Sequence, residues 1–356
     1  MHRFTHPLMR HPRPAINPPP VDSPQGDDSG VCASSNPPMP GSFPENDDPP
    51  TPHQPSVLDV LVVKAMMTKA LTLPLELVNR IIDFAEYWPH TSAQLDYGGT
   101  PHPVARGSSP LEDVFLLRTL PLGLIKQVNP DPRHYQTEEA KLLRLSSEHP
   151  VEQFHKWTGS PSHTVQHPCR KIVFTITSSD QGWGGMMADR GTYRHSFTWF
   201  EAGLERIDAS GECGDYCPDH ARQAMDPSSS DSTTRPDISP CAMRPIVPAL
   251  VGEPEKRLRM EHPLAPLEEY MIQCNKTASR DGPHTHVVEW RADDNIDPDT
   301  PQAQELVNAG RGRATGTGEF VRNLKLGDVI TVWAKARFVG WQNNLKFLKV
   351  DVYWAV

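Results

Sequence analysis

The stretch Arg170–Glu205 constrains the fold of this chain more than any other. Apolar and polar side chains alternate along Arg170–Thr177, with Ile172, Phe174 and Ile176 on one face. This period of two is typical of a half-buried strand. A Gly-rich polar loop follows at Ser178–Arg194, and an aromatic-rich second strand is expected at Ser196–Leu204. The stretch therefore predicts a hairpin-like unit.

Further strand candidates follow the same logic across residues 151–356. The expected strands are Arg170–Thr177, Ser196–Leu204, Tyr270–Cys274, His286–Trp290, Gly318–Arg322, Asp328–Phe338 and Leu345–Val356. Short strands with Gly and Asn turns predict an antiparallel β-sandwich or jelly roll. The fold class expected for the whole chain is α+β, mainly β.

The last two strands are predicted to form a hairpin, with its turn at Gly340–Asn344. In Asp328–Phe338, one face carries Ile330, Val332, Ala334, Ala336 and Phe338, and the other carries Thr331, Trp333, Lys335 and Arg337. In the last strand, Val352 and Trp354 share the apolar face with Leu348 and Val350. We expect one face of these strands to pack and the other to stay available.

Two segments have a composition that does not support a packed core. Residues 1–56 hold 15 of the 38 prolines and almost no large apolar side chains. Such a segment cannot bury enough surface to offset its ordering entropy, so we expect a disordered tail. Residues 206–268 break the strand pattern and are expected to be a long, largely disordered insertion in the sandwich. A second low-complexity loop is expected around Asp293–Pro301.

Charge and hydropathy exclude two classes of partner. A net charge of −9 argues against a general nucleic-acid or anionic-membrane surface. There is no run of 18 apolar residues, so no membrane-spanning helix is expected. The six cysteines are scattered and no export signal precedes them. Reduced thiols in the cytoplasm or nucleus are therefore expected.

Residues 57–150 are predicted to form a small helical unit. Apolar side chains recur at helical spacing in Val57–Ala70 and again in Leu71–Trp88. Thr72 can cap the second helix, Pro74 fits its first turn, and Pro89 stops it. Its apolar stripe consists of Leu77, Ile81, Phe84 and Trp88, with Val78 and Ile82 beside it. Thr137 is expected to cap a further helix over Glu138–Leu145.

The segment Leu73-Pro74-Leu75-Glu76-Leu77, followed by Ile81-Ile82, resembles the opening of an F-box. The resemblance covers about 18 residues and stops at Pro89. It implies a helix that docks on the adaptor of a cullin-type ubiquitin ligase through Leu73, Pro74, Leu77 and Ile81. The alternative is an ordinary amphipathic helix packed on its own domain.

The β region has a resemblance of its own. The stretches RKIVFTITSSDQGWGG, SFTWFEAGLE and the C-terminal Val-Tyr-Trp segment resemble a group of uncharacterised filamentous-fungal proteins, some with an F-box-like helix upstream. The resemblance covers roughly 160 residues in pieces, together with the helix at Leu73–Trp88. It implies a β-sandwich like galactose-binding domains and implies no activity.

Patterns that could carry chemistry are weak. Cys213, Cys217 and His220 offer three zinc ligands without a second close pair, so reduced thiols are the alternative. His284 and His286 fall on one side of a strand without a third ligand, and Gly310–Gly318 lacks the Lys-Ser/Thr of a phosphate-binding loop. Glu201 and Asp180 could form a carboxylate pair for glycoside chemistry, but nothing in the sequence fixes their separation. No catalytic residue, metal or cofactor is predicted, and the chain is not expected to be an enzyme.

The loop Ser178–Arg194 is the best candidate ligand site. The predicted ligand-binding residues are Asp180, Gln181, Trp183, Arg190, Tyr193 and Trp341, with both tryptophans in one cleft. An aromatic plane flanked by polar groups suits a sugar or an extended peptide. The alternative is structural: Trp183 plugs one end of the sandwich, and Asp180 pairs with Arg190.

Together these features predict an F-box-like adaptor, a substrate receptor of a cullin-type ubiquitin ligase that recognises its targets through the β-sandwich. The alternatives are a carbohydrate- or peptide-binding sandwich without a ligase role, and a hydrolase built on the sandwich.

Overall fold

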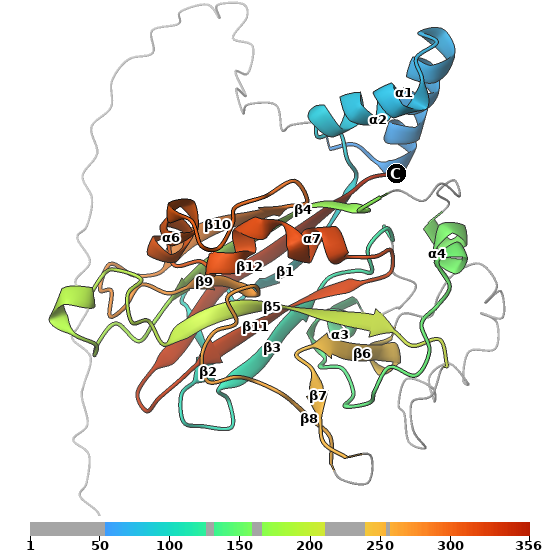
Figure 1. Ribbon diagram of the computed structural model, residues 1–356. Helices are drawn as coiled ribbons and strands as arrows, with labels where there is room; N and C mark the ends of the chain where they lie inside the picture. The colour runs from blue at the N-terminus through green and yellow to red at the C-terminus, as the bar shows by residue number, and fades with distance from the viewer. Residues whose placement is uncertain (1–53, 126–131, 159–165, 211–238, 254–256) are drawn as a thin grey trace, which may run out of the picture. The chain divides into compact units, whose positions relative to one another are not determined.

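The computed structural model describes residues 54–125, 132–158, 166–210, 239–253 and 257–356 (Figure 1). The predicted disordered tail lies outside these residues except for Gln54, Pro55 and Ser56. The centre of the predicted insertion, 211–238, also lies outside them. No helix in the described part of the chain is long and apolar enough to cross a membrane.

The described chain is mainly β, and its sheets are antiparallel, as expected. The first sheet has the order β1 (His90–Asp96), β12 (Gln342–Trp354), β4 (Cys169–Ser179) and β10 (His284–Arg291), with β2 (His102–Arg106) beside β12. The second has the order β3 (Asp113–Arg118), β11 (Val329–Ala336), β5 (Thr198–Ile207) and β6 (Met243–Val247), with β9 (Met271–Cys274) beside β5. A short ribbon pairs β7 (Leu250–Val251) with β8 (Arg259–Met260).

Side chains from both sheets meet in one hydrophobic core. The first sheet contributes alternate residues such as Ile172, Phe174 and Val350, and the second contributes Phe200 and Ile330, all fully buried. This period-two burial is the pattern that the sequence predicted for β4 and β12.

The prediction that Val352 and Trp354 of the last strand are buried is confirmed. Val352 is 1% exposed and Trp354 is 3% exposed, and both belong to the shared core.

Replacement of Trp354 by Ala should therefore lower the free energy of unfolding by about 3–5 kcal/mol, because it removes a large buried side chain and leaves a cavity. Urea denaturation measures this loss. Val287→Ala is the control, since Val287 is 67% exposed and should change stability by less than about 0.5 kcal/mol. Equal costs for the two variants would place Trp354 outside the core.

The two predicted hairpins are wrong. β4 and β5 lie in different sheets, and so do β11 and β12. β12 instead pairs with β1, β2 and β4, and β11 pairs with β3 and β5. Alternation determines which face of a strand is buried, but not which strand lies beside it, and therefore the sequence pattern did not reveal that these loops cross between sheets.

The expectation that one face of β11 stays available is also wrong. On its outer face Thr331, Trp333, Lys335 and Arg337 are buried like the apolar residues of the inner face. The segment after β8 covers them: His262 Nδ1 lies 2.6 Å from Lys335 Nζ, and Arg337 donates to the Pro263 carbonyl at 2.8 Å. Lys335 also contacts Asp113 at 3.0 Å and Glu201 at 3.5 Å.

The environment of His262 makes stability depend on pH. Burial and the charges of Lys335 and Arg337 together lower the pKa of His262 from 6.5 to about 4, although the charge of Asp113 opposes them. Between these two pH values the unfolded chain binds a proton that the folded chain does not. The free energy of unfolding should therefore fall as the pH drops from 6.5 to 4.

In His262→Gln this part of the pH dependence should disappear, while the amide oxygen still accepts from Lys335. Urea unfolding at several pH values between 7 and 4, compared with the wild type, measures the difference. Parallel pH profiles for the two proteins would show that His262 is not held neutral.

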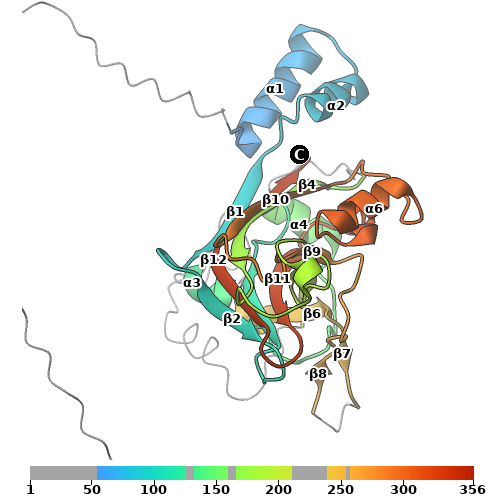
Figure 2. The same cartoon turned by 90° about the vertical axis from the view of Figure 1, so that its left-hand side faces the viewer.

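The predicted helical unit 57–150 is too long. Among the described residues before β1, only α1 (Val57–Ala70) and α2 (Leu75–Phe84), here called the helix pair, are helical, and Figure 2 shows β1 running directly into them. Strands β1, β2 and β3 then belong to the two sheets. The predicted helix over Glu138–Leu145 is absent, because α3 (Pro132–Thr137) ends where it was to begin; α4 (Val151–Thr158) follows.

Capping of the helix pair also differs from expectation. Ser56 and Asp59 form a capping box at α1, whereas Thr72 does not cap α2, whose N-cap position is Pro74.

The predicted strand Gly318–Arg322 is a helix, α7 (Glu319–Asn323), preceded by α6 (Pro301–Asn308) and the 3-10 turn η4 (Arg313–Thr317). Gly318 has a φ of 72°, and a Cβ there would lie 2.5 Å from the Asp294 carbonyl oxygen, so this turn requires glycine. Arg322 stabilises it by donating to the carbonyls of Ala292 and Thr317.

The predicted insertion is interrupted by structure. β6 pairs with β5 and therefore belongs to the second sheet, and β7 and β8 follow it.

Candidate functional site

Three loops converge beyond the end of β4, at residues 180–195, 275–281 and 338–342; we call this the loop end. Backbone hydrogen bonds join the first two loops, from Gly191 N to the Thr277 carbonyl at 2.8 Å and from Thr277 N to the Thr192 carbonyl at 2.7 Å. The side chain of Gln181 joins the third by accepting from Gln342 N at 3.1 Å. The loop end is thus one connected structure.

Asp180 serves as an internal staple of the loop end. It is 3% exposed and accepts from Gly182 N at 2.7 Å and from Ala278 N. Burial raises the pKa of the Asp180 carboxyl, although these two hydrogen bonds oppose the rise. Its partners are backbone N–H groups, so the structure does not show the alternative pairing with Arg190.

Trp183 and Trp341 lie at the same end of the sheets. A Cβ at Gly340, which precedes Trp341, would lie 3.1 Å from Trp183 Cη2, and one at Gly185 would lie 3.9 Å from Trp341 Cη2. Trp341 packs edge-on against Phe197, with centroids 5.1 Å apart, and Phe197 packs against Phe338 at 4.7 Å. Trp183 is 61% exposed, so it presents an indole plane rather than plugging the core.

The other predicted ligand residues have separate positions. Arg190 is exposed and makes no hydrogen bond or ion pair with the described residues. Tyr193 is half-buried beneath Gly310, and its hydroxyl lies 2.8 Å from His286 Nε2. Burial raises the pKa of Tyr193, and burial with repulsion from His284 and Lys276 lowers the pKa of His286 to about 4. The side chain of Tyr193 therefore has a structural role in the loop.

Sequence reasoning missed several residues of the loop end. Asp189 is buried and accepts from His195 Nδ1 at 2.8 Å, which holds the loop beside Arg190. Phe338 has a φ of 65°, an uncommon conformation for a bulky residue, and this strain lies where side chains face solvent. The apolar run Phe338-Val339 before Gly340 was the available signal, but the sequence pattern assigned Phe338 to a buried strand face.

The helix pair presents the second candidate surface. α2 anchors itself through Val78 and Ile82, which are 0% and 4% exposed, and turns Leu77 and Ile81 outward at 47% and 42%. Of the other predicted partner residues, Pro74 is exposed and Leu73 is half-buried against the core. The large exposed apolar side chains around them are Leu58, Val62, Met66, Leu71, Leu75 and Phe84.

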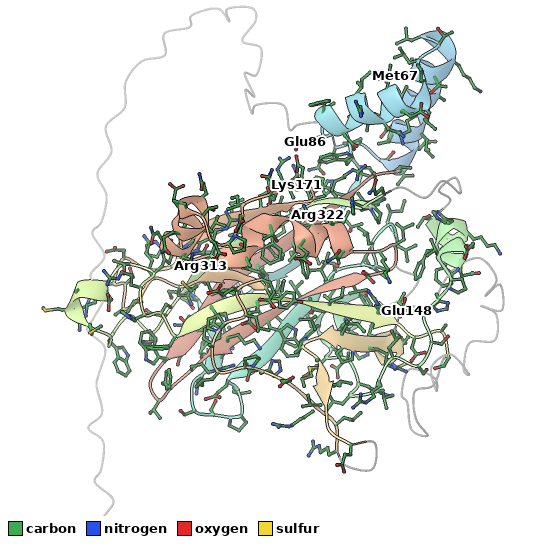
Figure 3. All side chains as sticks on the ribbon, viewed as in Figure 1. Met67, Glu86, Glu148, Lys171, Arg313 and Arg322 are labelled. Atoms are coloured by element: carbon green, nitrogen blue, oxygen red, sulfur yellow. The ribbon has the colours of Figure 1, made fainter. Side chains whose placement is uncertain are left out.

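Polar contacts hold the helix pair on the first sheet. Arg170 donates to both carboxylate oxygens of Asp83 at 3.0 and 3.1 Å, and Trp88 Nε1 donates to the same carboxylate at 2.9 Å. Figure 3 shows Glu86 beside Lys171 at the foot of α2, where their ion pair measures 2.5 Å. Trp88 is therefore part of this anchor and does not continue the apolar stripe of α2.

The other candidate catalytic and metal-binding residues do not form a site among the described residues. Glu201 accepts from Trp199 Nε1 at 2.7 Å and from Leu267 N, whereas Asp180 accepts from Gly182 N and Ala278 N, so each carboxylate has its own structural partners. Cys213, Cys217 and His220 lie outside the described residues. Within the described ranges no group of three potential metal ligands occurs; His284 and His286 contact Ser279 and Tyr193 instead.

Comparisons with protein-family models, with curated proteins and with solved structures found no match for this chain.

The different roles of Asp180 and Trp183 can be measured. Asp180→Ala should lower the free energy of unfolding by about 1–3 kcal/mol, because the N–H groups of Gly182 and Ala278 lose their acceptor. Trp183→Ala should change it by less than about 0.5 kcal/mol, as expected for an exposed side chain. Urea denaturation of both variants is the test, and the reverse ranking would mean that Trp183 is the structural residue.

Proposed function

We propose that this chain is a non-enzymatic adaptor of the cytoplasm or nucleus. Its helix pair docks on the adaptor subunit of a cullin-type ubiquitin ligase, and its β region recognises a target protein. We interpret the two sheets with their common core as a β-sandwich.

The exposure pattern of α2 carries the proposal. A helix that only covered its own domain would bury its apolar face, yet α2 buries Val78 and Ile82 and still exposes Leu77, Ile81 and Phe84 at 47%, 42% and 91%. Exposed apolar side chains gathered on one element mark a protein-interaction surface. Leu77 and Ile81 are two of the residues on which the F-box resemblance rests.

The positions of the two surfaces support an adaptor role. β12 begins at Gln342, beside Gln181 of the loop end, and ends at Trp354, close to where Lys64 of α1 donates to the Val356 carbonyl. A strand rises about 3.3 Å per residue, so its 13 residues separate the two ends by roughly 40 Å. The two surfaces therefore lie at opposite ends of β12, and Figure 1 shows the helix pair near the C-terminus that follows this strand.

The resemblance has a limit that defines the proposal. After Pro89 the chain enters β1, which pairs with β12, so the helix pair leads directly into the sheet. The proposed contact with the ligase therefore involves α1 and α2 alone.

The double variant Leu77→Asp and Ile81→Asp tests this contact. Carboxylates at the centre of an apolar interface remain desolvated and unpaired, so capture of purified ligase adaptor should weaken at least tenfold, roughly 1.4 kcal/mol. Pull-down and size-exclusion chromatography measure capture, and urea denaturation checks that the sheets stay folded.

The matched control is Leu264→Asp with Val287→Asp, two side chains that are each 67% exposed on other elements. This control should bind like the wild type. Unchanged binding of the α2 variant would reject the helix-pair interface, and a wild-type chain that captures no adaptor would reject the ligase role.

A ligand-binding protein without a ligase role is the second candidate, favoured by the exposed indole of Trp183 beside Gly340. In that case the helix pair only caps the β region, and the variant Leu77→Asp with Ile81→Asp should leave ligand binding unchanged.

A further inference from the structure

The carboxylate and amide side chains of Asp180, Gln181 and Asp189 are already used within the loop end. Asp180 accepts from Gly182 and Ala278, and Asp189 accepts from His195. Gln181 accepts from Gln342 N and donates to the Trp183 carbonyl at 2.5 Å. A sugar needs both donors and acceptors for its hydroxyl groups, and these residues no longer supply the acceptors.

Large apolar side chains remain available at the same end. Trp183 is 61% exposed, Met186 60%, Met187 84%, Phe338 45% and Val339 85%. Trp, Phe and Met are enriched in protein interfaces, and Met adapts to irregular partners. The tight turns at Gly182, Gly184 and Gly340, all with positive φ, and the hydrogen bonds of Asp180 fix the loops before any ligand binds.

Free charges at the loop end are mainly guanidinium groups. Arg106, Arg190 and Arg280 are exposed, and none of their guanidinium groups has a hydrogen bond or ion pair with the residues that the structure describes. Arg106 lies opposite Gln342 on β12, and Arg280 follows Ser279, whose carbonyl faces Gly182. Arg194 contacts Asp189 at 3.6 Å, and the exposed acid nearby is Asp281, next to Arg280.

We propose that the loop end binds an extended peptide of a target protein in which a large apolar residue is flanked by acidic residues. The apolar residue packs on Trp183, Phe338 and the methionines, and its neighbouring carboxylates contact Arg190, Arg106 and Arg280. Guanidinium groups match carboxylates in geometry and charge. This inference rests on the target-recognition half of the proposed function.

The chain carries a net charge of −9, which does not by itself attract an acidic peptide. Exposed arginines gathered beside aromatic side chains then provide the place where attraction and apolar contact coincide.

A random twelve-residue peptide library, displayed on phage and selected against the full chain, tests the inference. The enriched peptides should combine at least one aromatic or large aliphatic residue with a net negative charge. Fluorescence anisotropy with the best peptide, labelled with fluorescein, should show binding that weakens at least tenfold in Trp183→Ala and in Arg190→Glu. Binding should also weaken with added salt, as expected for charge pairs.

Matched controls are Leu264→Ala and Arg259→Glu, which change an exposed apolar and an exposed basic residue on other elements. Both should bind the peptide like the wild type. The inference is overturned if no peptide is enriched, if the enriched peptides are basic or neutral, or if both loop-end variants bind normally. Selective binding on a glycan array, lost in Trp183→Ala, would also overturn it.

Failure here is distinguishable from failure of the ligase contact, because the peptide assay contains no ligase adaptor and the loop-end variants leave α2 unchanged. Adaptor capture that persists in Trp183→Ala with Arg190→Glu would separate the two surfaces directly.

Discussion

The pairing of β12 is the constraint on which the described structure depends. This strand lies between β4 and both β1 and β2, and Leu345, Leu348, Val350, Val352 and Trp354 along it are buried. Its ladder therefore links the helix pair at one end with the loop end at the other. Displacing β12 would open the hydrophobic core and separate the two candidate surfaces, so the fold and the proposed adaptor role rest on the same strand.

The second sheet depends on a different interaction, the pairing of buried charges. Arg118 contacts Glu205 at 2.7 Å with both side chains almost fully buried, and Lys335 lies between Asp113 and Glu201. Although burial raises the pKa of Asp113, the charges of Lys335 and Arg337 hold it below its usual value. Loss of one partner from such a pair costs more than the pair contributes, since the other charge stays buried, and this favours one arrangement of strands.

The loop end and the helix pair expose side chains for different physical reasons. At the loop end, Asp180 and Gln181 form hydrogen bonds with backbone groups of three loops, while aromatic and basic side chains face solvent. In the helix pair, the buried Val78 and Ile82 together with the polar contacts of Asp83 and Glu86 provide the anchor, and other apolar side chains of α1 and α2 stay exposed. In both places internal contacts satisfy one set of groups and make another set available.

The sequence by itself determined the strand periodicity, the buried face of β12, the two helices before Pro89 and the loop that carries Trp183, because these follow from the spacing of apolar residues and from Gly and Pro. Tertiary structure decided the rest. Pairing between distant strands sent β4 and β5 to different sheets, brought β1, β2 and β3 out of the predicted helical unit, and covered the outer face of β11. Tertiary contacts also bury Asp180 and leave Trp183 exposed. The buried position of Asp180 depends on its hydrogen bond with Ala278 N, nearly a hundred residues away in the chain. The local sequence pattern does not show which distant segment will contact a given residue. That contact determines whether a polar group is hydrogen-bonded within the protein or stays available to a ligand.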